Sequence, residues 1–330
     1  MKKVLPLVDP VSNNCQSSDL FKNIATDWLT LIGANVVFTT LGEYERSLGR
    51  YFIPQFGSRP IDSITYEELS LYLAKLPVCG KTFNNVMTPL RGVFAYAKRS
   101  GKILEDITEH IDWRKHQAPG PDPLEPGEVL RVIDYLRATQ HPTWHNYFEV
   151  AMFTGIRPSE QIALRWPAVD FRREQLCIRA ARVRSREKDT KTHRIRYVDL
   201  QSRAAQALIR QRELTHTLTG HIFINPCTGR FFASSATAMD VWREALRETG
   251  IRPRSARQTR HTYATLCLHA GMNPAYVSRQ MGHTNAKMFF ETYSRWLDGH
   301  ANDREKAKMD AFLLAETNFQ TGVFTSYVTA

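Results

Sequence analysis

Apolar residues recur at helical spacing through the first hundred positions of the chain. In four segments they lie three or four residues apart, which places them on one face of a helix and leaves the other face polar. The pattern predicts a small all-helical domain over residues 18–105, preceded by a flexible lead at residues 1–17, where no periodicity is visible. The four apolar faces lie within residues 21–29, 41–52, 69–73 and 86–97.

Residues at the helix ends support this reading. Thr40 with Glu43, and Thr65 with Glu68, have the spacing of a capping box, in which side chains bind the free N–H groups of a helix start. Gly101 follows the fourth apolar face, where glycine can take the left-handed conformation that ends a helix. The second and third helices are therefore expected to begin at the two threonines.

A proline-rich segment interrupts the helical pattern after the first domain. Residues 117–123 contain three prolines and a glycine, which is typical of a domain boundary. The basic residues just before it suit a chain that wraps around a nucleic-acid duplex, and equally a plain tether. We expect a linker over residues 106–123.

Periodicity resumes in a second domain, expected over residues 124–300, and here it alternates between helix and strand. The fold class predicted for the whole chain is mainly α, with a small antiparallel β-sheet in the second of two domains. A charged amphipathic helix with Met309, Phe312 and Leu313 follows at 302–314, and residues 317–330 carry no charge. Helices are expected to begin at Pro126, at Pro158, near Arg260 and at Pro274, and further helices are expected at 144–152, 202–217, 235–249 and 288–293. Strands are expected at 176–183, 195–200 and 222–224, with a polar hairpin tip at 184–193.

Composition places the chain among globular proteins that bind polyanions. Hydrophobic residues make up 42% and charged residues 23%, and no apolar run approaches the roughly 18 residues of a membrane span. Lysine and arginine number 44 against 33 acidic residues, a formal net charge of +11. Such a surface favours DNA or RNA, although a basic protein need not bind either.

The cysteines indicate a reducing compartment. There are five, an odd number, scattered and without a C-x-x-C pair, which is typical of free thiols in the cytoplasm. Cys267, His269 and His283 lack the paired spacing of zinc ligands, so no metal site is expected.

The densest chemistry lies between Arg257 and Tyr293. This segment offers two guanidinium groups, at Arg257 and Arg260, two imidazoles, at His261 and His283, and the phenol of Tyr293. Guanidinium groups match pairs of phosphate oxygens, imidazole moves protons near neutral pH, and a phenol can act as a nucleophile. The set suits transfer of a phosphoryl group to tyrosine.

An earlier group of residues has complementary chemistry. Arg157 follows Gly155 and precedes Pro158, so it is expected at a helix N-terminus, where free N–H groups favour an anion. Glu160 lies one turn into that helix and could orient the region. Lys191 lies on the expected hairpin tip, where a lysine taken alone is usually just solvated.

Together these residues resemble the tyrosine recombinase (phage integrase) family over residues 20–300. The resemblance rests on T-G-x-R-x-x-E at residues 154–160, K-T at Lys191, R-H at residues 260–261, a G-H preceded by Met281 and ending at His283, and a tyrosine soon after it, Tyr293. Each motif is weak alone, but their order behind a helical domain is specific. It implies a helical DNA-binding domain joined to a catalytic domain.

The chain departs from the family pattern at two places. Arg257 stands where the family usually has histidine, three residues before the second arginine, and a guanidinium cannot serve as a general base. Tyr293 lies one residue further from His283 than the commonest family spacing. Tyr263 and Tyr276 lie in apolar stripes, so Tyr293 stays the best candidate nucleophile.

The resemblance also implies a mechanism. Arg157, Arg260 and either Arg257 or His283 would stabilise the negative charge of the reacting phosphate, supported by Glu160. Lys191 would protonate the departing 5′ oxygen, and Tyr293 would form a 3′-phosphotyrosyl link. Because that link stores the energy of the phosphodiester, the resemblance implies no metal or nucleotide cofactor.

The partners implied are double-stranded DNA with specific attachment sites, further copies of the chain in a tetramer, and in some systems DNA-bending accessory proteins. Residues 301–330 would dock on a neighbouring subunit or pack on their own domain. Many integrases carry a separate arm-binding domain before the helical one. Residues 1–20 are too few for it, so we expect either no such domain or one that lies outside this sequence. Cations expected either to be merely solvated or to face the DNA backbone are Lys81, Arg91, Lys98, Arg99 and Lys102.

Three functions remain open on the sequence. The first is an integrase of a prophage or other mobile element. The second is a DNA-binding regulator or assembly factor that has lost catalysis, which the arginine at position 257 keeps in play. The third is a relaxing enzyme similar to type IB topoisomerases.

Overall fold

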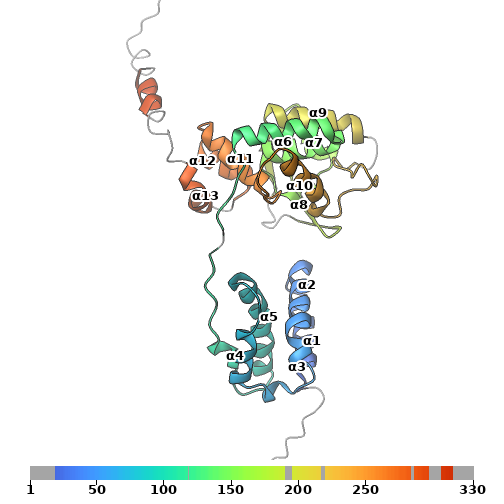
Figure 1. Cartoon of the computed structure of the whole chain (residues 1–330), viewed down its shortest axis with the longest axis vertical. Helices are drawn as coiled ribbons and strands as arrows, with labels where there is room; N and C mark the ends of the chain where they lie inside the picture. Colours follow the sequence, from blue (N-terminus) through green and yellow to red (C-terminus); the bar gives the residue numbers. More distant parts are fainter. Residues whose placement is uncertain are drawn as a thin grey trace, which may run out of the picture. The chain divides into compact units, whose positions relative to one another are not determined.

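The computed structural model describes residues 19–117, 119–189, 195–216, 220–283, 286–296 and 306–314. The chain divides into two compact units, residues 1–119 and 120–330, here called the N-terminal and C-terminal units. Helices dominate both, and short antiparallel strands occur in the C-terminal unit (Figure 1). This confirms the predicted fold class.

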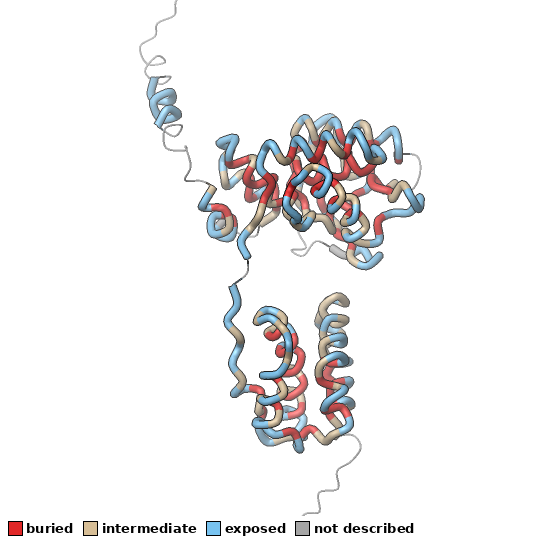
Figure 2. Tube along the Cα trace, viewed as in Figure 1, coloured by how far each residue is buried: buried red, intermediate tan, exposed pale blue. Residues whose placement is uncertain are grey.

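The N-terminal unit is a helical bundle around an aromatic core. Phe21, Phe52, Phe56 and Phe94 are fully buried, and buried positions shown in red recur along this unit (Figure 2). Its helices are α1 (Phe21–Gly33), α2 (Phe38–Ser47), the π-helical turn η2 (Leu48–Phe52), α3 (Ile53–Phe56), η3 (Ile61–Ser63), α4 (Tyr66–Ala74), α5 (Gly80–Arg99) and η4 (Ile107–His110).

One of the two predicted caps is wrong. Helix α2 begins after Val37, which makes no side-chain cap, so Thr40 lies inside the helix. Thr65 does cap α4, because its hydroxyl accepts the Glu68 N–H at 3.2 Å. The Glu68 carboxylate instead pairs with Arg59, so the capping box is half formed.

Part of the expected linker packs on the N-terminal unit. Arg114 donates to the carbonyl oxygen of Leu73 at 2.9 Å, and its guanidinium lies 3.9 Å from the centre of the Phe83 ring. Arg91 donates to the carbonyl oxygen of Ile111 and stacks 4.3 Å from the Trp113 ring. Residues 111–114 therefore extend the packed unit, and the division between the units falls after residue 119.

The C-terminal unit is organised around α7 (Pro142–Thr154), which contacts α6, α9 and α11. Nearly all of α7 is buried, and Tyr147 and Phe148 pack there against Phe223, Phe232 and Trp242. The other helices are α6 (Pro126–Thr139), α8 (Pro158–Gln161), η5 (Trp166–Ala168), α9 (Ser202–Thr215), η6 (Ser235–Ala238), α10 (Met239–Glu248), α11 (Gln258–His269), α12 (Pro274–Met281), α13 (Ala286–Tyr293) and η7 (Ser294–Trp296); residues 306–314 are also helical.

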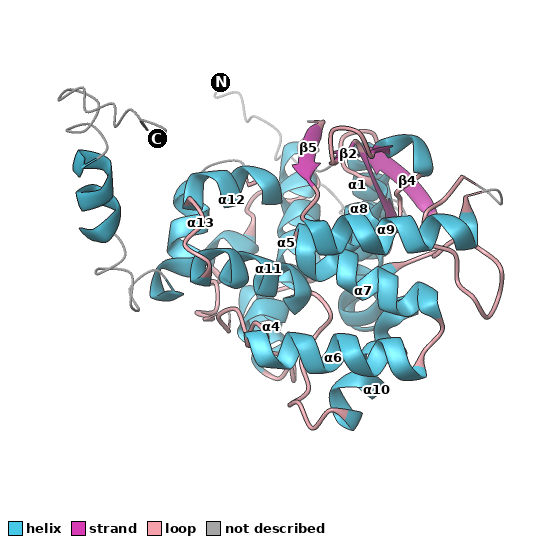
Figure 3. Ribbon diagram, turned by 90° about the horizontal axis from the view of Figure 1, so that it is seen from above, coloured by secondary structure: helices cyan, strands magenta, loops and turns pink. Residues whose placement is uncertain are grey.

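The strands form two small sheets, shown in magenta in Figure 3. Strands β1 (Val169–Asp170), β2 (Gln175–Ile178) and β5 (Arg196–Asp199) pair in the order β1-β2-β5, with Leu176 opposite Val198. Strands β3 (Ala180–Val183) and β4 (Arg186–Asp189) form a hairpin of their own.

Three strand predictions need correction. The single strand expected at 176–183 is two strands, because the chain changes sheets at Arg179. Of the tip expected at 184–193, the described residues 184–189 form a tight turn at Arg184 and Ser185, both with positive φ, followed by β4, and residues 190–193 lie outside the described ranges. Residues 222–224 form no strand; Ile224 makes an isolated bridge to Phe231.

A glycine in α5 tests the packing of the N-terminal bundle. A Cβ added at Gly92 would lie 2.1 Å from Cζ2 of Trp28, whereas one added at Gly49 would meet nothing within 4 Å. We predict that Gly92→Ala destabilises this unit by about 1–3 kcal/mol through overpacking. Gly49→Ala, also in a helical turn, should stabilise it by about 0.5–1 kcal/mol.

Calorimetric melting of the two variants measures both effects. The transition of the N-terminal unit should move down for Gly92→Ala and up for Gly49→Ala. Equal shifts in the same direction would show that Trp28 does not pack against α5 at this point.

Candidate active site

Gly155 sets the start of the site by ending α7. Its φ is +61°, and an added Cβ would lie 2.3 Å from Cδ1 of Tyr263, so only glycine fits. Arg157 follows, just before α8. That helix is a single turn, and the anion at its start is the Glu160 carboxylate, which accepts the Arg157 N–H at 2.9 Å. The predicted helix start at Pro158, with Arg157 just before it, is confirmed, and Glu160 supplies the anion at this end of the helix.

Glu160 is the buried centre of this region. Only 2% of the residue is exposed, and its carboxylate accepts two hydrogen bonds from the Arg196 guanidinium, at 3.0 and 2.7 Å. The Arg157 guanidinium donates a further bond at 2.9 Å. Burial would raise the pKa of Glu160, but the bonds and charges of Arg196 and Arg157 outweigh it and lower the pKa below its ordinary value.

The same two arginines hold the end of α12. Arg157 donates to the carbonyl oxygen of Gly282 at 3.3 Å, and Arg196 donates to that of Gln280 at 3.2 Å. Gly282 has φ +70°, and an added Cβ would lie 2.8 Å from the Arg196 side chain. This close approach places His283, the next residue, beside the guanidinium groups.

His283 is a neutral imidazole in a positively charged setting. Burial, followed by the charges of Arg260 and Arg157, lowers the pKa of His283 to about 4. Its Nδ1 atom is buried and has no hydrogen-bond partner among the residues that the structure describes. A buried ring nitrogen without a partner is unusual and marks a place where a ligand atom could bind.

Arg260 lies in the first turn of α11 and is only 9% exposed. Its Nη1 donates to the carbonyl oxygen of Gly155 at 2.6 Å. Burial and then the nearby Arg157 charge lower the pKa of Arg260, yet a guanidinium stays charged at neutral pH. Within the described ranges no carboxylate pairs with it, so its charge lacks a direct counter-ion.

Tyr293, the last residue of α13, is 1% exposed and packs against Phe289 and Trp296. Its hydroxyl lies 2.6 Å from Nδ1 of His261. Burial raises the pKa of Tyr293 to about 12, against the opposing effect of the Arg260 charge. Burial and Arg260 also lower the pKa of His261.

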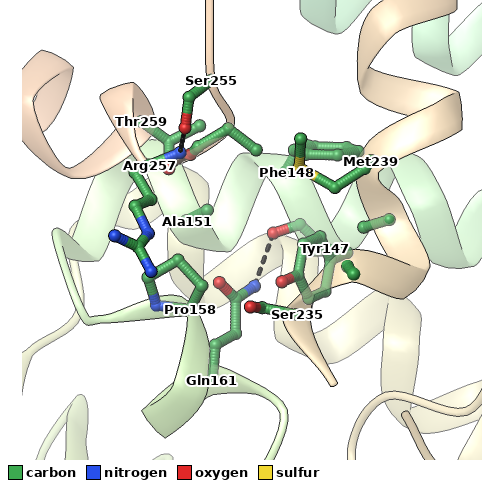
Figure 4. Close-up of a pocket in the computed structure, with 13 residues that line it drawn as sticks. Tyr147, Phe148, Ala151, Pro158, Gln161, Ser235, Met239, Ser255, Arg257 and Thr259 are labelled. Atoms are coloured by element: carbon green, nitrogen blue, oxygen red, sulfur yellow. Dashed lines mark hydrogen bonds between the residues drawn. The ribbon is translucent and has the colours of Figure 1, made fainter. Parts of the chain in front are cut away.

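Arg257 lies at the edge of the neighbouring pocket shown in Figure 4. It is exposed, its N–H donates to Oγ of Ser255 at 3.2 Å, and its side chain extends toward Pro158. Its guanidinium has no hydrogen-bond or ion-pair partner in the described part of the chain. The pocket is a cavity of about 240 Å³ with apolar walls that include Phe148 and Met239.

The structure thus brings Arg157, Glu160, Arg260, His283 and Tyr293 together, with Arg257 at the side. Lys191 lies outside the described residues, between β4 and β5.

Sequence reasoning did not select two residues that the site contains. His261 is adjacent to Arg260 and was visible in the same motif, whereas nothing local in the sequence marks Arg196.

The expected DNA-surface cations differ in their surroundings. Arg91 is engaged with Ile111 and Trp113, as described above. Lys98 pairs with Glu109 at 3.3 Å and Lys102 with Asp19 at 2.6 Å, whereas Lys81 and Arg99 are exposed without an ion pair among the described residues. A hollow of about 580 Å³ between α2 and α5, which the sequence did not suggest, is lined by Arg46, Arg50, Thr82, Asn85 and Thr88.

Two surveys of the described residues are negative. No helix is long and apolar enough to cross a bilayer. No group of three or more His, Cys, Asp or Glu side chains has the arrangement of a metal site.

Comparison with known proteins agrees with this geometry. The phage integrase family profile matches residues 123–300. The chain is 28% identical to IntQ of Escherichia coli (strain K12), a protein named as defective, with 85% of this chain and 80% of IntQ covered. It is 27% identical to the prophage integrase IntR of the same strain, with 89% of this chain and 80% of IntR covered.

A solved structure shares the fold. A lambda integrase tetramer bound to a Holliday junction superposes with a TM-score of 0.69 at 14% identity, covering 83% of this chain and 80% of that chain. The family match extends over more than half of the chain and confirms the resemblance seen in the motifs. The chain therefore belongs to the phage integrase family of tyrosine-type site-specific DNA recombinases.

Proposed function

We propose that Tyr293 is the nucleophile with which this recombinase cuts and rejoins DNA for the integration or excision of a prophage or other mobile element. The observation that carries the proposal is the buried Arg260 guanidinium, without a carboxylate partner, beside a phenol and an unpartnered imidazole nitrogen. A scissile phosphate supplies the anion that this arrangement lacks.

The charges of the site support a phosphate ligand. Arg157, Arg196 and Arg260 face one carboxylate, that of Glu160, so two positive charges remain unbalanced. Attack on a phosphodiester adds negative charge to its oxygens, and fixed donors at this place stabilise the transition state more than the ground state. Loss of one such donor costs about 3 kcal/mol, or roughly a hundredfold in rate.

One imidazole and two cations complete the proposal. His283, neutral at pH 7, donates a hydrogen bond to a phosphate oxygen without adding charge. Lys191 protonates the leaving 5′ oxygen, and Arg257 contributes charge at the margin. Because Tyr293 is 1% exposed, DNA binding has to uncover its hydroxyl before attack.

The proposed partner is duplex DNA carrying attachment sites, with four copies of the chain assembled as in the lambda integrase tetramer on a Holliday junction. In the N-terminal unit, Lys81, Lys98, Arg99 and Lys102 remain candidates for the DNA backbone, whereas Arg91 serves packing first. Free thiols at the described cysteines suit a cytoplasmic site of action. Accessory DNA-bending proteins belong to the same proposal.

A second candidate function is a DNA-binding regulator without strand cleavage. The observation that favours it is the exposed arginine at position 257, where the family usually has a histidine. A regulator would bind attachment-site DNA and form no covalent adduct. The attachment site is found by sequencing the joined DNA ends in cells that carry the gene. A nicked duplex with that sequence then distinguishes the two functions, because only a recombinase forms a covalent adduct with it.

The nucleophile is tested by Tyr293→Phe, with Tyr276→Phe as its matched control. Tyr276 lies on α12, and its hydroxyl donates to Asp199 at 2.9 Å, away from the guanidinium cluster. We predict that Tyr293→Phe binds the nicked duplex and forms no covalent adduct on a denaturing gel, whereas Tyr276→Phe still forms it. An adduct formed by Tyr293→Phe would show that another residue is the nucleophile. If the unmodified chain forms no adduct, the regulator function is supported instead.

Glu160→Gln should destabilise the C-terminal unit by about 3–5 kcal/mol at pH 7, because it removes the buried anion that pairs with the partly buried Arg157 and Arg196. The pKa of Glu160 is lowered on folding, so its contribution is complete above the ordinary carboxyl pKa of about 4.3 and is lost as pH falls through the lower folded-state pKa. In Glu160→Gln, the free energy of unfolding should therefore fall less between pH 7 and pH 3 than in the unmodified chain.

Thermal melting between pH 7 and pH 3 measures both effects. Glu248→Gln is the control, because Glu248 pairs with Arg247 at the surface, where ion pairs contribute little. If Glu160→Gln melted like Glu248→Gln at pH 7, the buried carboxylate would not hold the site together.

The helix at 306–314 is proposed to dock on a neighbouring subunit. Met309, Phe312 and Leu313 share one face and are each more than half exposed, at 60%, 61% and 54%. We predict that Phe312→Asp, like truncation after Ala301, abolishes four-subunit assembly on DNA in native gels while a single subunit still binds. Leu104→Asp, at a fully exposed leucine of the other unit, should leave assembly intact. Normal assembly of the truncated chain would place this helix on its own subunit.

A further inference from the structure

Among the described residues, the hydroxyl of Tyr293 has one hydrogen-bond partner, His261. Nδ1 of His261 lies 2.6 Å away, and the two ring centres are 5.7 Å apart. The contact joins the first turn of α11 to the last residue of α13, which are 32 positions apart in the chain. A hydrogen bond this short places a basic nitrogen directly on the atom that attacks phosphorus in the proposed reaction.

Among the described residues, the other groups near this hydroxyl place no basic atom in hydrogen-bond contact with it. Arg260, the charged group whose field reaches it, only donates hydrogen bonds. Phe289 and Trp296 cover the ring with hydrocarbon and an indole. No carboxylate of the described residues interacts with it, and no hydrogen bond joins it to His283, whose Nδ1 has no partner among the described residues.

The state of His261 suits an acceptor. Burial and the neighbouring Arg260 charge lower the pKa of His261, so the ring is neutral at pH 7 and one nitrogen has a free lone pair. With the ring proton on Nε2, Nδ1 accepts the hydrogen bond from the phenol. Tyr293, with its pKa raised to about 12, keeps its proton until a base removes it.

Helix geometry relates this residue to the unusual arginine. Arg257 immediately precedes α11 with a helical backbone conformation, and His261 lies four residues further on. Their side chains therefore lie on the same side, about 6 Å apart along the helix axis. Arg257 cannot act as a base, and the first residue on its side of the helix that can do so is His261. The basic function lies one turn further along α11.

We propose that His261 is the general base of DNA cleavage and that it replaces the histidine absent at position 257; this inference rests on Tyr293 as nucleophile. As the phenolic oxygen bonds to phosphorus, the Tyr293 proton passes to Nδ1 of His261. The bond from phosphorus to the 5′ oxygen breaks, and that oxygen takes a proton from Lys191. During rejoining, the imidazolium returns its proton to the phenolic oxygen.

The test uses two substrates built on the mapped attachment site, one with the ordinary 5′ bridging oxygen and one with sulfur in its place. A thiolate leaves without a proton, so sulfur removes the need for a general acid but not for a base. We expect His261→Ala to slow single-turnover adduct formation by about 10²–10⁴-fold on both substrates. Lys191→Ala should be slow with oxygen and close to wild type with sulfur.

A second variant separates a base from a positioning residue. Asn at 261 can place a hydrogen-bond acceptor near Nδ1 but has no basic nitrogen. His261→Asn should therefore be as slow as His261→Ala, and added imidazole should restore part of the His261→Ala rate. Rates near wild type for His261→Asn would make His261 a positioning residue and overturn the proposal.

The pH profile gives an independent readout. Above the lowered pKa of His261 the wild-type rate should be level, and it should fall as pH drops below that value. Without the base, the rate should rise about tenfold per pH unit through neutrality, as the phenolate fraction grows. Melting and DNA binding of both variants confirm folding.

The failures are distinguishable. If the unmodified chain forms no adduct on its mapped site, the proposed function fails and this assignment with it. If wild type and Lys191→Ala behave as expected but His261→Ala keeps the wild-type rate and pH profile, or if sulfur restores its rate, only the base assignment fails.

Discussion

The site depends on one buried carboxylate. Glu160 holds two guanidinium groups that would otherwise repel each other, and those guanidinium groups in turn bind the carbonyl oxygens of Gln280 and Gly282. A buried charge is costly unless it is paired and fully hydrogen-bonded. Here the bond from Arg196 to Glu160 and the bonds to the two carbonyl oxygens link different segments. The turn α8, strand β5 and the end of α12 are thereby fixed together, and the position of His283 follows from them.

The second constraint is the protonation state of Tyr293 and of its neighbour His261. Burial keeps the phenol protonated and the imidazole of His261 neutral, so neither group is charged before DNA arrives. The Arg260 charge lowers the pKa of both groups, because it favours the phenolate of Tyr293 and disfavours the imidazolium of His261. Arg295 binds the carbonyl oxygen of Pro121 and stacks on Trp296, which holds the turn after α13 over the tyrosine. Storage of the nucleophile and its activation therefore involve the same short segment.

Local signals in the sequence predicted much of this arrangement. Gly155, Asn273 and Gly282 mark helix ends by their own conformational preferences, and the structure has helix ends at all three. The strand at 176–183 was misread because periodicity cannot show that Arg179 moves the chain from one sheet to another. Arg196 and His261 were missed as site residues for a related reason. Their partners lie 36 and 32 positions away, and only the folded chain shows those contacts.

The balance of charge explains why this cluster fits a reacting phosphate better than a resting one. Three guanidinium groups and one carboxylate leave two positive charges, whereas a phosphodiester carries one negative charge and its five-coordinate transition state carries two. His283 adds a hydrogen-bond donor without adding positive charge, because its lowered pKa keeps the imidazole neutral at pH 7. Arg257 would add a third unbalanced positive charge if it lay inside the cluster. Because it is exposed at the edge, solvent screens its charge. In the proposed mechanism, electrostatic stabilisation comes from Arg157, Arg196 and Arg260, and the base is His261, one helical turn beyond position 257.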